Sequence, residues 1–185
     1  MNKFALVAAA AALLAVPATA NAQAYVQVTG GLDSLSNSGD SSEGVAYGVA
    51  AGYDAPVRSN MFVGFEGSVS DSTVKECAGS VVNDGFRVCA KTGRDLAAVV
   101  RVGTQVGATS KLYVLGGYTN ARVIATYRDD AGRFSDGSNL DGFRLGAGYE
   151  KNFSDKFFGK IEYRYSNYES DFSRHNVLAG VGVKF

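Results

Sequence analysis

Apolar residues alternate with small or polar residues along most of this chain. A period of two places every second side chain on the same face of an extended strand, so the pattern predicts β-structure. The alternation is clearest in the last nine residues, where one face is small or polar apart from Leu178. The opposite face is apolar and ends on an aromatic residue: Val177, Ala179, Val181, Val183 and Phe185.

Eight segments with this alternation follow residue 22. Most of them have about the length that a tilted strand needs to cross a bilayer. We expect strands near residues 24–33, 44–54, 61–71, 95–106, 111–123, 140–152, 156–168 and 174–185.

The connections between these segments alternate in length. Short periplasmic turns and longer outer loops are typical of outer-membrane barrels. The sequence therefore predicts an all-β fold, an eight-stranded antiparallel up-and-down transmembrane β-barrel with both termini in the periplasm. A soluble β-sandwich would also alternate, but it would not explain the terminal Phe185 or the aromatic residues at strand ends. The short connections are 55–60, 107–110 and 153–155; the longer polar ones are 34–43, 72–94 and 124–139, with a shorter fourth at 169–173.

The first 22 residues have a different composition from the rest of the chain. Lys3 provides a basic start, residues 4–16 are apolar, and Ala20-Asn21-Ala22 is a small-residue cleavage site. These features predict a secretory signal peptide over residues 1–22. The mature barrel domain would then span 23–185, with cleavage within two residues of this boundary.

Charge narrows the function classes. The chain holds 18 Lys and Arg against 18 Asp and Glu, and this balance argues against a nucleic-acid partner. After residue 22, no apolar run is long enough to form a transmembrane helix. Cys77 and Cys89 are the two cysteines of the chain, and a secreted protein normally pairs an even number. We therefore predict a Cys77–Cys89 disulfide in the longest outer loop, because no neighbouring His or Cys suggests a metal or redox site.

The charged residues within the strands should face the barrel lumen. A basic side chain facing lipid at mid-bilayer costs about 2 to 4 kcal/mol, and inward-facing charges must pair with one another. The strand over 111–123 is ambiguous, because Tyr113 and Leu115 compete with Leu112 and Val114 for the outer face. The predicted lumen network is Glu66, Arg101, Arg144, Lys160, Glu162 and Arg164, with Glu150 and Lys184 nearer the periplasmic rim.

This network has two interpretations. An eight-stranded barrel has little interior space beyond what its own side chains fill, which favours a paired polar plug. The alternative is a path for ions or protons through the lumen.

Catalytic and metal sites lack the residues they require. The lipid A deacylase family uses an H-x-S-N motif, but Arg164 stands at the position of the catalytic His, and Arg cannot act as a general base. His175 lies near Ser173 and Asp171, yet alternate residues of a strand are about 6 to 7 Å apart, too far for a catalytic triad. A calcium loop starting at Asp136 would close on Ala147 instead of Glu. We therefore predict no catalytic residue, no metal site and no cofactor.

The segment 161–168 reads IEYRYSNY, and the chain ends G-V-K-F. These two motifs resemble the last strands of small eight-stranded barrels of the opacity-protein-like porin family of Gram-negative bacteria. The resemblance covers the expected mature chain as architecture and only the last two strands as motif. It implies an outer-membrane protein inserted by the barrel-assembly machinery, for which Val181, Val183 and Phe185 would form the C-terminal insertion signal. It also implies roles in envelope integrity, host-cell adhesion and complement evasion, with partner specificity in variable loops.

We therefore expect a non-enzymatic outer-membrane protein that contributes to envelope integrity and contacts surface or host ligands through its loops. A narrow porin-like channel for ions or small solutes is the alternative, and a lipid A-modifying enzyme is less favoured. Outer-membrane lipids and lipopolysaccharide would surround the barrel. Basic loop residues could bind lipopolysaccharide phosphates or simply be solvated: Lys75, Arg87, Lys91, Arg94, Arg128 and Arg133.

Overall fold

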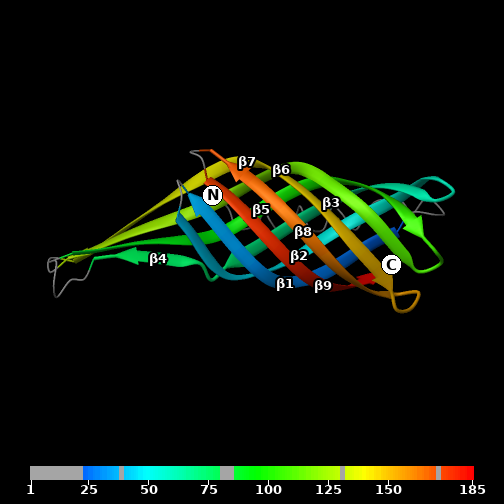
Figure 1. Cartoon of the computed structure of the whole chain (residues 1–185), viewed down its shortest axis with the longest axis horizontal. Helices are drawn as coiled ribbons and strands as arrows, with labels where there is room; N and C mark the ends of the chain where they lie inside the picture. The colour runs from blue at the N-terminus through cyan, green and yellow to red at the C-terminus, as the bar shows by residue number, and fades with distance from the viewer. Residues whose placement is uncertain (1–22, 38–39, 80–85, 130–131, 170–171) are drawn as a thin grey trace.

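The computed structural model describes residues 23–37, 40–79, 86–129, 132–169 and 172–185 (Figure 1). These residues form nine β-strands. Within the same ranges, no helix is long and apolar enough to cross a membrane. The strands are β1 Gln23–Asn37, β2 Asp40–Arg58, β3 Met61–Ser72, β4 Lys75–Ala78, β5 Phe86–Val106, β6 Ser110–Asp129, β7 Gly132–Asn152, β8 Phe157–Tyr168 and β9 Phe172–Lys184.

Eight of the nine strands close into an antiparallel up-and-down barrel. Each pairs with its neighbours in the chain, β3 pairs directly with β5, and β1 pairs with β9 to close the ring. The predicted barrel is therefore confirmed, but the strand count needs a correction. Among the described residues, the ninth strand, β4, pairs with β5 alone, and it lies in the segment that was expected to be a loop.

Five strands are longer than the alternation predicts. β1 continues to Asn37 and β2 begins at Asp40, so most of the expected loop 34–43 is paired strand. β5 begins at Phe86, β6 continues to Asp129 and β7 begins at Gly132, so most of the expected loop 124–139 is a two-stranded ladder. Together with β4, the extensions of β5, β6 and β7 form a sheet that continues past the ends of β8 and β9 (Figure 1). We call it the projecting sheet: residues 75–78, 86–92, 122–129 and 132–141. Its strands were missed because lipid no longer demands apolar residues on one face there.

The barrel wall follows the predicted alternation. On β9, Val181 is 59% exposed and the terminal Phe185 is 74% exposed. The N–H of Phe185 donates to the carbonyl of Ala24 at 2.9 Å, which ties the C-terminus to β1. The ambiguity on β6 is resolved, because Tyr113 and Leu115 are buried inside while Leu112 and Val114 are exposed outside. An apolar outer belt results, which suits contact with lipid.

Candidate functional site

Charged side chains fill the barrel interior in two clusters. The inner cluster lies towards the short turns, and the outer cluster lies below the projecting sheet. Since a buried charge is costly unless it is paired, their contacts determine what the lumen can do. The inner cluster is Asp54, Glu66, Arg101, Lys111, Glu150, Lys160, Glu162, Arg164 and Lys184; the outer cluster is Asp33, Asp95, Arg144 and Arg174.

Arg101 on β5 is the centre of the inner cluster, and it is fully buried. Its guanidinium nitrogens lie 3.4 Å from Glu66 Oε2 and 3.2 Å from Glu150 Oε2. It also donates a hydrogen bond to the hydroxyl of Tyr25 and lies 4.1 Å from the ring centroid of Tyr113. Arg101 thus joins carboxylates from two strands on different sides of the lumen.

Three alternate residues of β8 extend this network. Glu162 Oε2 lies 2.9 Å from Lys160 Nζ, and Glu162 also accepts hydrogen bonds from Arg164 and from Tyr113. Arg164 reaches across to Glu66 Oε1 at 3.2 Å. Because all three face inward on one strand, the predicted facing of β8 places a carboxylate between two cations.

The outer cluster has a separate set of contacts. Arg174 forms a bidentate pair with Asp33, with both N–O distances at 2.7 Å. Arg174 also lies 3.1 Å from Asp95, and Arg144 lies 2.8 Å from the same oxygen of Asp95. Arg144 completes its contacts by donating to Ser166 Oγ at 2.8 Å. Two arginines and two carboxylates therefore neutralise one another.

The structure buries all six predicted lumen residues but does not bring them together. Arg144 belongs to the outer cluster, whereas the other five lie in the inner one. Sequence reasoning missed Asp33, Asp54, Asp95, Lys111 and Arg174, because each lies at the end of an expected strand, where solvent seemed available. Their spacing contained the signal, since Asp95 lies an even number of residues from Arg101 on the same strand.

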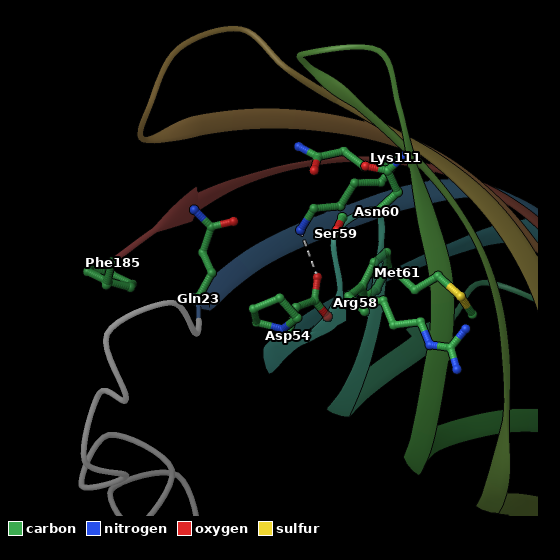
Figure 2. Close-up of a pocket in the computed structure, with 11 residues that line it drawn as sticks. Gln23, Asp54, Arg58, Ser59, Asn60, Met61, Lys111 and Phe185 are labelled. Carbon is green, nitrogen blue, oxygen red and sulfur yellow. Dashed lines mark hydrogen bonds and ion pairs between the residues drawn. The ribbon is translucent and has the colours of Figure 1, made fainter.

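A cavity of about 360 Å³ opens at the periplasmic mouth, between the turn that joins β2 to β3 and the C-terminus (Figure 2). Asp54 and Lys111 line it and form an ion pair at 3.0 Å, drawn as a dashed line in Figure 2. Behind this pair, Asp54 lies 3.9 Å from Arg101. The cavity therefore ends on the inner cluster.

One face of the projecting sheet is basic. Arg87, Arg128 and Arg133 lie directly opposite one another on β5, β6 and β7, and Lys75 lies opposite Lys91. Directly opposite residues share a face of a sheet. This face continues the lipid-facing side of β6, and between residues 122 and 139 its described part carries no Asp or Glu. We call it the basic face, and its cations are all exposed: Lys75, Arg87, Lys91, Arg122, Arg128 and Arg133.

The predicted disulfide lies on the basic face. Cys77 of β4 is directly opposite Cys89 of β5, and the two sulfurs are bonded. The disulfide lies between the Lys75–Lys91 pair and the row of Arg87 and Arg128. It therefore holds β4 and its lysine against the rest of the sheet. Arg94, also expected in the basic set, lies instead at the β-bulge between Thr92 and Asp95.

The opposite face of the projecting sheet looks towards the barrel axis and is apolar. Val88, Tyr127 and Phe134 lie directly opposite one another and are exposed, and Phe86 stacks on Tyr127 at 6.2 Å. Its charged residues are acidic: Glu76, Asp129 and Asp136. The two faces of this sheet therefore differ in both charge and polarity.

The histidine is part of an aromatic group on the barrel wall. The Tyr163 hydroxyl lies 2.7 Å from His175 Nδ1, and the Tyr165 ring lies 5.0 Å from the His175 ring. Asp171 lies outside the described residues. Within the described ranges, no group of three or more His, Cys, Asp or Glu side chains is arranged to hold a metal ion.

Comparison with known proteins identifies the family. The family model for the outer membrane protein β-barrel domain matches residues 6–185. The chain belongs to this outer-membrane β-barrel family. It is therefore a protein of the bacterial outer membrane, as the resemblance of its last two strands implied. The match overlaps the expected signal peptide, which lies outside the described residues and stays a prediction.

Individual relatives agree with this family. The 25 kDa outer-membrane immunogenic protein of Brucella ovis is 28% identical over 131 residues, covering 69% of this chain and 58% of that protein. Among solved structures, Ail, the attachment invasion locus protein of Yersinia pestis, has a TM-score of 0.63 at 15% identity, covering 89% of this chain and 99% of that one. Neisserial surface protein A has a TM-score of 0.60 at 16% identity, covering 88% and 97%. At such identities, these structures show the small outer-membrane barrel fold alone.

Proposed function

We propose that this outer-membrane barrel is a non-enzymatic surface protein that binds anionic partners through its basic face. The observation that carries the proposal is the row of Arg87, Arg128 and Arg133 across three neighbouring strands. The barrel serves as a rigid membrane anchor, and contact with lipopolysaccharide around it contributes to envelope integrity.

Electrostatics supports an anionic partner for this row. Like charges directly opposite one another destabilise a strand pair, and neighbouring strands are about 4.8 Å apart. A phosphate or sulfate group relieves this repulsion, because the planar guanidinium of Arg binds such groups through two hydrogen bonds. The free energy that three adjacent arginines cost in the isolated sheet is thus recovered on binding.

The position of the basic face suggests two anionic partners at two heights. Tyr118 and Phe143 are exposed aromatic residues directly opposite each other on the outer face, as expected near a membrane–water interface. Arg122 is four residues beyond Tyr118 on β6, so it is placed to reach lipopolysaccharide phosphates. Arg128 is ten residues beyond Tyr118, which corresponds to about 34 Å along the strand. At that distance from Tyr118, a polyanion on another surface that contacts the cell is a better partner than lipopolysaccharide phosphate. Ail, a structural neighbour, was solved in complex with the heparin analogue sucrose octasulfate, which supports this class of ligand.

We also propose that the lumen is a closed polar plug, and its side-chain contacts support this. Both clusters consist of paired charges, and buried Ala97, Val99, Leu115 and Leu178 lie on the lumen side of the wall. A narrow channel is the competing function. Planar-bilayer recordings of the refolded protein should be silent, and discrete conductance steps that change when Glu162 is neutralised would establish the channel instead.

Heparin binding by the refolded protein in detergent micelles tests the basic face. The triple variant Arg87→Glu, Arg128→Glu and Arg133→Glu should bind at least tenfold more weakly, and affinity for the unchanged protein should fall steeply with salt. Lys156→Glu provides the control, because Lys156 is an exposed cation in the turn at the opposite end of the barrel. If Lys156→Glu weakens heparin binding as much as a single Arg→Glu substitution on the basic face, then net charge, and not this face, governs binding.

A further inference from the structure

The inner face of the projecting sheet, which lies opposite the basic face, exposes large apolar side chains. Phe134 is 67% exposed, Phe86 is 42% exposed and Tyr127 is 41% exposed. Tyr127 lies an even number of residues from the lumen-facing Leu115 on β6, so its side chain points towards the barrel axis and away from lipid. Apolar patches that water can reach mark sites of interaction on many proteins.

The pairing register arranges this face in rows. An apolar row crosses β5, β6 and β7: Val88, Tyr127 and Phe134. The next row towards the barrel has small residues at its centre and a carboxylate at each end: Glu76, Ala90, Ala125 and Asp136. Because neighbouring strands are about 4.8 Å apart, the strands that carry these two carboxylates are about 14 Å apart. The low centre of this row allows a partner to approach the sheet closely.

A cavity of about 220 Å³ lies at the barrel end of the same face. Ala90 lines it together with apolar residues of the barrel rim: Leu35, Val74, Val123, Leu140 and Phe172. Its charged lining residues are Glu76 and Lys91, and Lys91 belongs to the basic face. Sites for drug-sized ligands have about 300 Å³ or more, so this cavity is better suited to a single anchoring side chain.

The carboxylates of the inner face are available to a cation. Glu76 and Asp136 are both exposed, and each accepts a hydrogen bond from an uncharged donor, Ser42 Oγ and the N–H of Gly137 respectively. Within the described ranges, neither carboxylate forms an ion pair. The aromatic row beside them adds attraction, because a Lys or Arg side chain binds favourably over the face of an aromatic ring.

This chemistry favours a basic polypeptide over the other molecules that an outer-membrane protein meets. The carboxylates repel sulfated polysaccharides and lipopolysaccharide phosphates. Acyl chains stay in the membrane, whereas Tyr127 is nine residues beyond Tyr118, roughly 30 Å along β6. A neutral sugar would stack on the aromatic rings but would gain nothing from the negative charge or from the apolar cavity.

We propose that the inner face binds a basic amphipathic polypeptide segment. One apolar side chain of the segment occupies the cavity, others pack on Tyr127 and Phe134, and its Lys or Arg side chains pair with Glu76 and Asp136. Amphipathic segments commonly bind through a few regularly spaced apolar anchors of this kind. The site lies on the opposite side of the sheet from the arginine row, so it goes beyond the proposed binding of anions and does not depend on it.

Peptide binding to the refolded full chain in phosphatidylcholine nanodiscs tests the proposal. The probe is a fluorescein-labelled amphipathic peptide of lysine and leucine, and empty nanodiscs give the background. It should bind at least tenfold more tightly than a peptide with glutamate in place of lysine, and than one with serine in place of leucine. Equal binding of the serine peptide would overturn the proposal, because charge alone would explain it. Binding of a neutral maltooligosaccharide, with no binding of the lysine–leucine peptide, would overturn it in favour of a carbohydrate site.

Charge variants test the carboxylates. Asp136→Lys should weaken binding of the lysine–leucine peptide at least tenfold. Asp155→Lys is the matched control, because it makes the same charge change in an exposed turn at the opposite end of the barrel, and it should change the affinity less than twofold. Equal losses for these two variants would overturn the proposal. The triple Arg→Glu variant of the basic face should bind the peptide at least as tightly as the unchanged protein, so failure at one face is distinguishable from failure at the other.

Two variants without a charge change test the apolar contacts. Ala90→Trp fills the cavity that the anchor needs, and because Ala90 is exposed it should leave the fold intact. Phe134→Ser removes an exposed ring from the apolar row. Each should weaken peptide binding at least fivefold, whereas Ile124→Ser, on the opposite face of the same sheet, should change it less than twofold. Each variant must keep the altered gel mobility of a folded barrel before heating. Undiminished binding by folded Ala90→Trp, or an equal loss for Ile124→Ser, would overturn the proposal.

Discussion

Removal of a lumen arginine should destabilise the barrel. The loss in free energy of unfolding depends on whether the carboxylates that paired with this arginine keep another cation. Arg174→Met leaves Asp33 without a cation, because Arg174 is its sole ion-pair partner among the described residues. Asp33 then keeps only neutral contacts, such as the hydrogen bond that Asn176 donates at 2.7 Å. An uncompensated buried charge of this kind costs about 3 to 5 kcal/mol.

Arg101→Met should cost less, although Arg101 is the more deeply buried arginine. Glu66 keeps Arg164 at 3.2 Å, and Glu150 keeps Lys184 at 2.7 Å. The variant therefore loses charged hydrogen bonds worth about 1.5 to 3 kcal/mol, but it leaves no buried carboxylate without a cationic partner. This difference predicts that Arg174→Met lowers the free energy of unfolding more than Arg101→Met.

Urea unfolding of the refolded protein, followed by circular dichroism and by gel mobility before heating, measures both changes. Arg58→Met is the control, since Arg58 is exposed at the periplasmic rim, and its effect should stay within about 0.5 kcal/mol. Asp33→Asn added to Arg174→Met should recover part of the loss. An equal or larger loss for Arg101→Met would refute the reasoning that retained partners set the cost.

Three further predictions concern the C-terminus, the disulfide and the histidine. Phe185→Ala should slow insertion by the barrel-assembly machinery in cells while the purified variant still refolds in detergent, and normal outer-membrane levels in a pulse–chase experiment would contradict the insertion signal. Replacing Cys77 and Cys89 by Ser should destabilise the pairing of β4 with β5 by about 3 kcal/mol on the chain-entropy model, seen as faster proteolysis of β4 with an intact barrel. His175→Ala should leave lipid A composition unchanged in mass spectra of the producing cells; altered acylation would instead indicate an enzyme.

Alternation along the sequence was sufficient to predict the barrel and the facing of most of its strands, because lipid requires an apolar residue at every second position. The exception is β6, where Tyr113 and Leu115 are as apolar as Leu112 and Val114, and the structure decided which pair faces the lumen. Arg101, Lys160 and Glu162 could be placed inside from this pattern alone. The C-terminal strand needed no other information, since its two faces differ at almost every position.

The tertiary structure decided which side chains meet. Partners such as Arg174 and Asp33 are 141 residues apart, so no local pattern joins them. The division of the lumen into two clusters depends on the curvature of the closed barrel, which places strands distant in sequence across from one another.

The projecting sheet also depended on the tertiary structure. Beyond the membrane no lipid enforces the alternation, and Asp129 and Asp136 interrupt the apolar face of the projecting sheet, although the ladder of hydrogen bonds continues. The alignment of Arg87, Arg128 and Arg133 follows from the register of three strands, which the sequence of any one strand does not contain. The projecting sheet exists because β6 and β7 continue together beyond the end of β8 at Tyr168, a difference in strand length that only the folded chain determines.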